Sequence, residues 1–181
     1  QRMPRPRPLA GRIALITGAA GGIGAATAMR LAAEGACVML TDRDADGLAL
    51  VETELVGRFG RDLVATAVCD VTEEQQVSGA FEATALGFGG LDILVANAGL
   101  ASSAPIEQTT IELWRRNYDV LAEGYFLAAR SAFPLMRLQN GGAIIFIGSK
   151  NALAATPNAA AYASAKAAAL HLARCLALEG A

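Results

Sequence analysis

Three side chains in the last third of the sequence have the types and spacing needed to take a proton from a hydroxyl group. Tyr162 and Lys166 are four positions apart, so a helix would place them on one face. A free tyrosine has a pKa of about 10, and a cation one turn away lowers that pKa because it favours the phenolate. Ser149, 13 residues before Tyr162, can hydrogen-bond the oxygen on which charge develops. The set predicts general-base catalysis.

Each of these residues also has an ordinary structural interpretation. Tyr162 can pack with its hydroxyl at the surface, Lys166 can be an exposed helix lysine, and Ser149 can belong to a turn or cap. The catalytic interpretation therefore needs support from other parts of the chain.

A glycine cluster between the first apolar run and the first helical pattern gives such support. It reads Thr17-Gly18-Ala19-Ala20-Gly21-Gly22-Ile23-Gly24. Without Cβ atoms the backbone can approach a pyrophosphate, and a helix N-terminus offers free N–H groups and partial positive charge. Glycines also form tight turns, so the indication depends on the position of the cluster between a strand and a helix.

A carboxylate ends the second apolar run, as a dinucleotide site requires. Asp42 follows Gly24 by 18 residues and can accept hydrogen bonds from both hydroxyls of an adenosine ribose. It would repel a 2′-phosphate, which favours NAD over NADP. Two alternatives stay open. Arg43 can bind a 2′-phosphate, and Asp42 can be a loop or cap residue like the neighbouring Asp44 and Asp46.

Short apolar runs alternate with longer amphipathic segments along the whole chain. This pattern predicts an α/β fold, a doubly wound parallel sheet of Rossmann type with strand order 3-2-1-4-5. Ligands of such sheets bind beyond the carboxyl ends of the strands. We expect strands at 12–17, 37–41, 63–68, 91–96 and 143–147. We expect helices at 24–35, 45–59, 73–87 (with Thr72 as cap and Gln75 at the capping-box position), 106–138 in two pieces, and 159–178.

Composition limits the class of protein. The 181 residues, 54% of them hydrophobic, suit one domain with a sizeable core, and a net charge of −2 gives no basic field for nucleic acid or anionic membrane. We see no signal-peptide core and no membrane-spanning run, so we expect a cytoplasmic protein. Cys37, Cys69 and Cys175 match no zinc spacing, so we expect free thiols and no metal site. Residues 1–8 are expected to be a linker or disordered arm, and 9–181 the domain.

From about Leu9 to its end, the chain resembles the short-chain dehydrogenase/reductase family, an NAD(P)-dependent group. Besides the residues above, Asp70-Val71 and Asn97-Ala98-Gly99 match family motifs in order and placement. The resemblance implies catalysis by Ser149, Tyr162 and Lys166. It implies cofactor contacts from Gly18, Gly22, Ile23, Gly24, Asp42, Asp70, Val71, Asn97, Ala98, Gly99, Tyr162 and Lys166.

Three stretches, 114–126, 149–155 and 171–181, look like one subgroup in particular. This is the dehydrogenase half of bifunctional rhamnulose-1-phosphate aldolase/short-chain dehydrogenases. That resemblance implies an aldolase domain upstream in the same polypeptide, joined through the Arg/Pro arm, and lactaldehyde or a sugar-derived molecule as substrate. The family as a whole implies a homodimer or homotetramer formed through the long helices after the fourth and fifth strands.

The sequence departs from the family pattern at two places. The catalytic asparagine expected in the long central helix is replaced by Leu121, and Asn117 lies one turn earlier, about 5 Å away, as a conceivable substitute. The chain also stops at Ala181, where the family continues into a sixth and a seventh strand. We therefore expect the fifth strand to be an edge and the domain to be incomplete at its C-terminus.

Three functions remain open from the sequence alone. The first is an NAD-dependent dehydrogenase for a small alcohol or aldehyde. The second is an NADP-dependent reductase of 3-oxoacyl or other carbonyl substrates, with Arg43 selecting the cofactor. The third is an NAD-binding module without turnover, which Leu121 and the missing strands would explain.

Overall fold

The computed structural model of the protein describes residues 7–181. Most of the predicted N-terminal arm, residues 1–6, therefore lies outside the described residues. Pro8 is exposed and leads into a turn in which the N–H of Ala10 donates to the carbonyl of Arg7 (3.1 Å). The division of the chain into an arm and a domain stays a prediction.

Five parallel strands form one sheet in the order β3-β2-β1-β4-β5, as the sequence predicted. Their aliphatic and β-branched residues suit a sheet covered on both faces, and β1 is buried at every position. The strands are β1 (Ile13–Thr17), β2 (Cys37–Asp42), β3 (Val64–Val68), β4 (Ile93–Ala96) and β5 (Ala143–Phe146).

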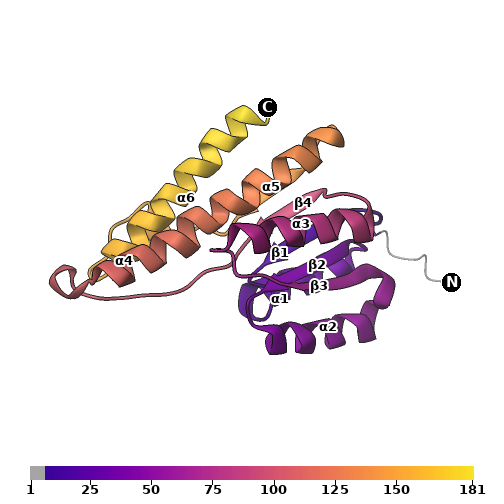
Figure 1. Cartoon of the computed structure of the whole chain (residues 1–181), viewed down its shortest axis with the longest axis horizontal. Helices are drawn as coiled ribbons and strands as arrows, with labels where there is room; N and C mark the ends of the chain where they lie inside the picture. Colours follow the sequence, from indigo (N-terminus) through magenta and orange to yellow (C-terminus); the bar gives the residue numbers. More distant parts are fainter. Residues whose placement is uncertain (1–6) are drawn as a thin grey trace.

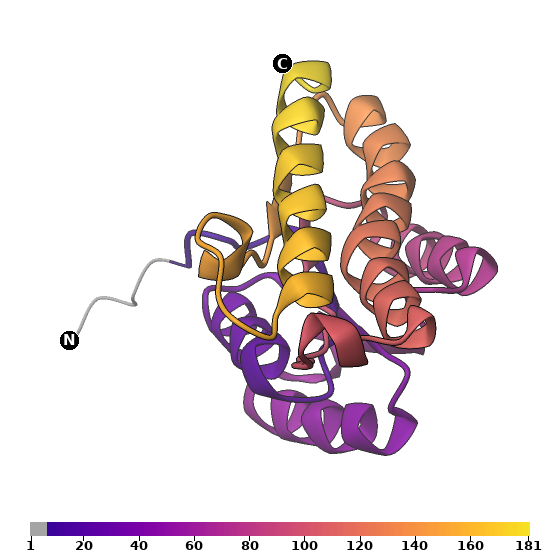
Figure 2. The ribbon, with the colours of Figure 1, turned by 90° about the vertical axis from the view of Figure 1, so that its left-hand side faces the viewer.

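Helices cover the sheet in two layers. Ala14 and Ile16 of β1 pack with side chains of α1 and α2, whereas Leu15 packs with side chains of α3 and α5 on the other face. Figure 1 shows these two layers, and α6 lies beside α5 in Figures 1 and 2. The helices are α1 (Gly22–Ala33), α2 (Ala45–Phe59), α3 (Glu74–Phe88), α4 (Ile111–Tyr118), α5 (Gly124–Leu138) and α6 (Ala160–Glu179).

The long central helix begins later than predicted. Residues Ile106–Gln108 form a separate short turn, and α4 begins after Thr110, whose hydroxyl accepts a hydrogen bond from the N–H of Leu113 (3.2 Å). Between α4 and α5 the segment Asp119–Glu123 is π-helical. The two predicted pieces are therefore joined by a wide turn, a feature that often occurs at functional sites.

The predicted cap of α3 is wrong. Thr72 does not cap the helix, because α3 begins one residue later than expected and Thr72 lies before the cap residue; its hydroxyl donates to the Asp70 carboxylate (2.8 Å). Glu73 occupies the cap position without a side-chain bond, and Gln76 rather than Gln75 reaches back, to the N–H of Asp70 (2.9 Å). α1 also begins two residues earlier than expected, at Gly22.

The fifth strand pairs with β4 alone and is an edge of the sheet. A cavity of about 550 Å³ lies beside it, lined by residues of α5, β5 and α6 such as Phe133, Met136, Phe146 and Leu176. None of the predicted site residues lines this cavity. Within residues 7–181, no helix combines the length and the apolar character needed to cross a membrane.

Candidate active site

The glycines of the loop after β1 have two different roles, close packing and open space for a ligand, which the sequence alone did not distinguish. Gly18 has φ +68°, and a Cβ there would lie 2.7 Å from Cα of Ala98; a Cβ on Gly24 would lie 2.0 Å from the carbonyl oxygen of Gly18. These two glycines let the loop fold against itself and against the chain after β4. Gly22, with φ +54°, faces open space instead. It leaves room for a phosphate.

The N-terminus of α1 is open to an anion. Its cap residue, Gly21, offers no side chain, and the helical bonds begin with the N–H of Ala25 donating to the carbonyl of Gly21 (3.2 Å). The N–H groups of Gly22, Ile23 and Gly24 precede that bond, and the Ile23 side chain is 61% exposed. This 12-residue helix thus directs unused donors and its positive end toward solvent, as a pyrophosphate requires.

Thr17 and Asn97 join the carboxyl ends of β1 and β4. The Asn97 amide donates to the carbonyls of Thr17 (2.9 Å) and Gly18 (3.0 Å). The Thr17 hydroxyl accepts from the N–H groups of Asn97 and Ala98, both at 3.0 Å. Because the strand order reverses between β1 and β4, this clamp fixes the position where such sheets bind their ligands. The sequence reasoning included Asn97 but missed the buried hydroxyl of Thr17.

Asp42 lies at the end of β2 and holds the glycine loop. Its carboxylate accepts from the N–H of Ala20 (3.1 Å) and from that of Asp44 (3.0 Å). The cap of α2 is Asp44, which accepts from the N–H of Gly47 (3.0 Å), so Asp42 is not a helix cap. A carboxylate has about four lone-pair positions, and two hydrogen bonds leave acceptor capacity for a ribose.

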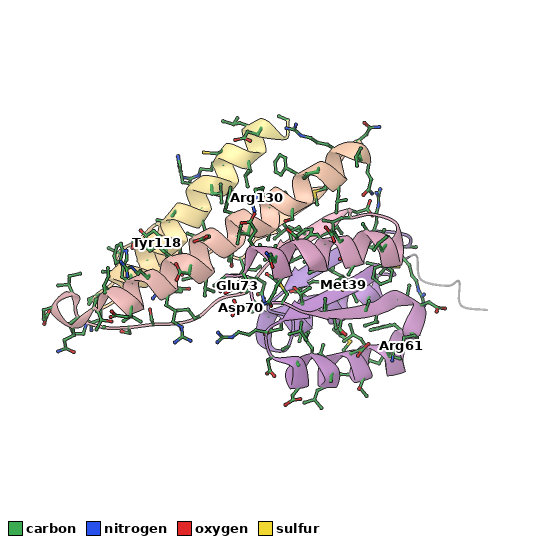
Figure 3. The ribbon with its side chains drawn as sticks, viewed as in Figure 1. Met39, Arg61, Asp70, Glu73, Tyr118 and Arg130 are labelled. Carbon is green, nitrogen blue, oxygen red and sulfur yellow. The ribbon has the colours of Figure 1, made fainter. Side chains whose placement is uncertain are left out.

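Loops that follow four strands meet at one small pocket of about 90 Å³. It contains most of the predicted cofactor residues outside the glycine loop and α6, together with Arg43 and Cys69. Asp70 lies beside Glu73 at the start of α3 (Figure 3), and its carboxylate is held by Thr72. Burial and the carboxylates of Asp70 and Asp42 raise the pKa of Cys69 to about 11, so this thiol stays neutral. The lining is Gly18, Asp42, Arg43, Cys69, Asp70, Val71, Ala98, Gly99, Leu100 and Val120.

The predicted catalytic lysine is buried at the corner between β5 and α6. Lys166 is 4% exposed, and its Nζ donates to the carbonyl of Ile147 (2.6 Å) and to the hydroxyl of Tyr125 (2.9 Å). Burial lowers the pKa of Lys166 to about 8. Tyr162, half-buried, lies one turn earlier on α6. The predicted pairing of a tyrosine and a lysine on one helix is confirmed as geometry.

Ser149 belongs to the same corner, two residues after Ile147. Its hydroxyl accepts a hydrogen bond from the N–H of Asn151 (3.2 Å) and so caps the short turn Lys150–Ala152. The capping role considered for this serine is therefore observed. This cap leaves the hydroxyl proton of Ser149 available for donation to another group, because one hydroxyl can accept and donate at once.

Asn117 does not replace the asparagine that the family carries at position 121. It is fully buried, with its amide donating to the carbonyl of Leu113 (2.8 Å) and its oxygen accepting from Ser102 (3.0 Å). Leu121 is also fully buried and packs near Gly99. Tyr125, the residue that does reach Lys166, was missed; the signal for it was a lone phenol in an otherwise apolar stretch of helix.

In the part of the chain that the structure describes, no three side chains among histidine, cysteine, aspartate and glutamate gather as a metal site would need. The three cysteines are free.

Replacing Thr17 by valine tests the clamp at the switch point. Valine has nearly the same shape but cannot accept from the N–H groups of Asn97 and Ala98, so we expect a loss of about 1–3 kcal/mol in the free energy of unfolding. Urea denaturation measures this loss. The Thr17→Ser variant keeps the acceptor and should stay near the parent. Equal losses in both variants would show that the methyl group, not the hydroxyl, matters.

Replacing Lys166 by methionine is expected to change how stability depends on pH. The pKa of folded Lys166, about 8, lies below its ordinary value of 10.5. Between these values the unfolded chain binds more protons, so the parent's free energy of unfolding rises with pH, by up to about 1.4 kcal/mol per pH unit. The variant lacks this contribution. The free energy of unfolding of the variant minus that of the parent should therefore fall from about pH 8 to 10. A Lys150→Met variant, which changes an exposed lysine, should follow the parent; identical pH dependence in all three proteins would contradict the prediction.

Comparison with known proteins identifies the family of the chain. A sequence model described as short chain dehydrogenase matches residues 12–181. The uncharacterized oxidoreductase YuxG of Bacillus subtilis is 48% identical over 170 residues, which cover 93% of this chain and 25% of that protein. Trans-4-hydroxycyclohexanecarboxylate dehydrogenase of Sinomonas cyclohexanicum is 40% identical over 162 residues, covering 87% of this chain and 62% of that one. The chain thus spans less than two thirds of these relatives.

Solved structures agree in fold. The crystal structure of levodione reductase superposes with a TM-score of 0.91 at 33% identity, over 94% of this chain and 67% of that chain. A short-chain type dehydrogenase/reductase from Mycobacterium marinum gives 0.91 at 35% identity, over 96% and 70%. The family model, the similar proteins and the solved structures agree, and the chain belongs to the short-chain dehydrogenase/reductase family.

Proposed function

We propose that this chain is a nicotinamide-dependent dehydrogenase domain acting on the CH–OH group of a small alcohol or on a small aldehyde. The observation that carries the proposal is Lys166, buried and one helical turn from Tyr162. A lysine is rarely buried without a role, because removing an ammonium group from water is costly.

The residues present fit a dinucleotide. The first turn of α1 and the open face of Gly22 would hold the pyrophosphate, and Asp42 the adenosine ribose. Asp70 and Val71 in the small pocket would contact the adenine, and Asn97-Ala98-Gly99 would support the cofactor through the clamp. Tyr162 and Lys166 would reach the nicotinamide ribose. When bound, the nicotinamide supplies the acceptor or donor of hydride, and the protein supplies orientation and electrostatics.

Tyr162 acts in this proposal as the base that takes the proton of the substrate hydroxyl. Lys166, with a pKa of about 8, is mostly protonated near neutral pH, and its charge favours the phenolate. Ser149 donates its free proton to the substrate oxygen and stabilises the charge that develops there. The three groups share the β5–α6 corner, so the substrate oxygen would lie between two hydroxyls.

NAD is the proposed cofactor because the Asp42 carboxylate, at the end of β2, would repel a 2′-phosphate on a ribose bound there. Arg43 lines the same pocket, which is the one observation in favour of an NADP-dependent carbonyl reductase. For the substrate we propose lactaldehyde or a related sugar-derived molecule, on the resemblance of the stretches 114–126, 149–155 and 171–181 to the aldolase-linked subgroup. The names of the relatives given above mention no aldolase, and the proposal of an upstream aldolase domain rests on those stretches alone.

We also propose a homo-oligomer formed through α4, α5 and α6, on which the apolar side chains of Ile111, Phe126 and Leu178 are exposed. The free cysteines support a reducing compartment, the cytoplasm. Sedimentation of the purified protein tests the first of these proposals. A monomer at micromolar concentration would overturn it.

The Tyr162→Phe variant tests the proposed base. We expect kcat to fall at least about 100-fold, because the phenyl ring cannot accept a proton, while NAD binding stays within a few-fold of the parent. Absorbance at 340 nm with NAD or NADP and a panel of small alcohols, diols and aldehydes measures turnover. Tyr118→Phe is the matched control. A parent protein that binds NAD but shows no turnover with any substrate would instead support an NAD-binding module without catalytic activity.

The Asp42→Ala variant tests cofactor choice. Loss of charge-assisted hydrogen bonds to the ribose should lower the ratio of kcat/KM for NAD over NADP by roughly 10- to 100-fold. Asp44→Ala is the control, since it removes the cap of α2 and should cost about 1 kcal/mol in stability without changing that ratio. A parent that prefers NADP, with a ratio unaffected by Asp42→Ala, would favour the reductase reading and Arg43.

A further inference from the structure

The side chain that completes the catalytic corner comes from Tyr125, one helical turn beyond the position where the family carries its asparagine. We propose that Tyr125 is a positioning residue: it holds the ammonium group of Lys166 in place behind Tyr162. The inference rests on the proposed function for its catalytic meaning, but the contact itself is independent of that function.

Three polar atoms from three elements form a closed triangle. Nζ of Lys166 on α6 donates to the Tyr125 hydroxyl on α5 (2.9 Å) and to the carbonyl of Ile147 after β5 (2.6 Å). The Tyr125 hydroxyl donates to the same carbonyl (3.1 Å). Two of the three ammonium N–H groups are thereby used, and the third remains for a partner such as the cofactor ribose.

The ring of Tyr125 supports the same cation. Nζ of Lys166 lies 4.7 Å from the ring centroid, within the range of a cation–π interaction. The ring packs edge-on against Phe146, with centroids 4.9 Å apart, and Tyr125 is 2% exposed. Hydroxyl and ring therefore act together on Lys166, and packing fixes the ring.

Tyr125 acts as a neutral dipole rather than as a second base. Burial raises the pKa of Tyr125 far above its ordinary value, and the nearby Tyr162 raises it further. The Tyr125 hydroxyl therefore keeps its proton. Among the described residues, the titratable group in contact with Lys166 is Tyr125 from α5. Tyr162 lies one turn earlier on α6, and no carboxylate forms an ion pair with Lys166.

The central helix is shaped to present this tyrosine. The π-helical turn Asp119–Glu123 ends immediately before Gly124, and a Cβ on Gly124 would lie 2.9 Å from Cγ2 of Val71. α5 therefore approaches the loop after β3 closely at its first residue. Leu121 fills apolar space near Gly99, and Tyr125 points to the end of β5.

Carbon-13 labelling of the lysine ε-methylene groups provides a direct test, because the sequence contains two lysines, Lys150 and Lys166. We expect the NMR titration midpoint of Lys166 to fall by about half to one pH unit in Tyr125→Phe, since a hydrogen bond to the charged form is lost. Lys150 serves as the internal reference. Tyr118→Phe removes the hydroxyl of a tyrosine that stacks on Trp114 and makes no hydrogen bond within residues 7–181, and should leave both midpoints unchanged.

Kinetics separate positioning from simple packing. In Tyr125→Phe we expect kcat to fall about tenfold with KM for NAD nearly unchanged, and the acidic limb of the kcat profile to move to higher pH because the phenolate of Tyr162 is less favoured. A variant that loses thermal stability but keeps the Lys166 midpoint and the kcat profile of the Tyr118→Phe control would overturn the proposal.

Two outcomes distinguish this inference from the proposed function. An inactive parent in which Tyr125→Phe still shifts the Lys166 midpoint would defeat the function but retain the contact. An active parent in which Tyr125→Phe gives no such shift would retain the proposed function but defeat the inference about Tyr125. If Tyr125→Phe is too unstable for titration, Phe146→Leu keeps the hydroxyl but releases the ring and should give a smaller shift in the same direction; no shift there would count against the proposal.

Discussion

The structure depends on keeping one ammonium group inside the protein without an opposite charge. Removing a cation from water costs several kcal/mol, and within the described residues no carboxylate approaches Lys166. Burial lowers the pKa of Lys166 to about 8, and its ammonium group donates hydrogen bonds to a backbone carbonyl and to a phenol. A carboxylate partner would stabilise the cation better but would cancel its field at Tyr162. Uncharged hydrogen-bond partners leave the positive charge of Lys166 able to favour the phenolate of Tyr162.

The opposite half of the site is built from backbone geometry rather than charge. Gly18 and Gly24 allow the loop after β1 to fold closely, and Asn97 and Thr17 fasten that loop to the end of β4. The strand order reverses between β1 and β4, and this reversal makes the two strands neighbours. The clamp between their ends can form because of that order. The parallel sheet then sets the distance from this loop to the corner at β5, so cofactor and base are positioned by the same five strands.

The sequence predicts the features that depend on chain order and periodicity. Strand order, the segment of each strand and the shared helix face of Tyr162 and Lys166 follow from apolar patterning and spacing. It does not predict features decided by competition between nearby groups. Thr72 was expected to cap α3, but it lies one residue before the cap and its hydroxyl donates to Asp70. The reach of Tyr125 to Lys166 is a contact between residues 41 positions apart, invisible to local pattern.

The replacement of the family's asparagine by Leu121 illustrates why one missing motif residue is weak grounds for denying an activity. What the corner requires is a fixed, uncharged polar group within hydrogen-bond reach of the ammonium, whichever residue supplies it. Leucine at position 121 then becomes acceptable, because an apolar side chain beside Gly99 leaves no unpaired polar atom in the interior. Leu121 and Tyr125 therefore have separate roles: Leu121 fills apolar space beside Gly99, and Tyr125 accepts a hydrogen bond from the ammonium of Lys166.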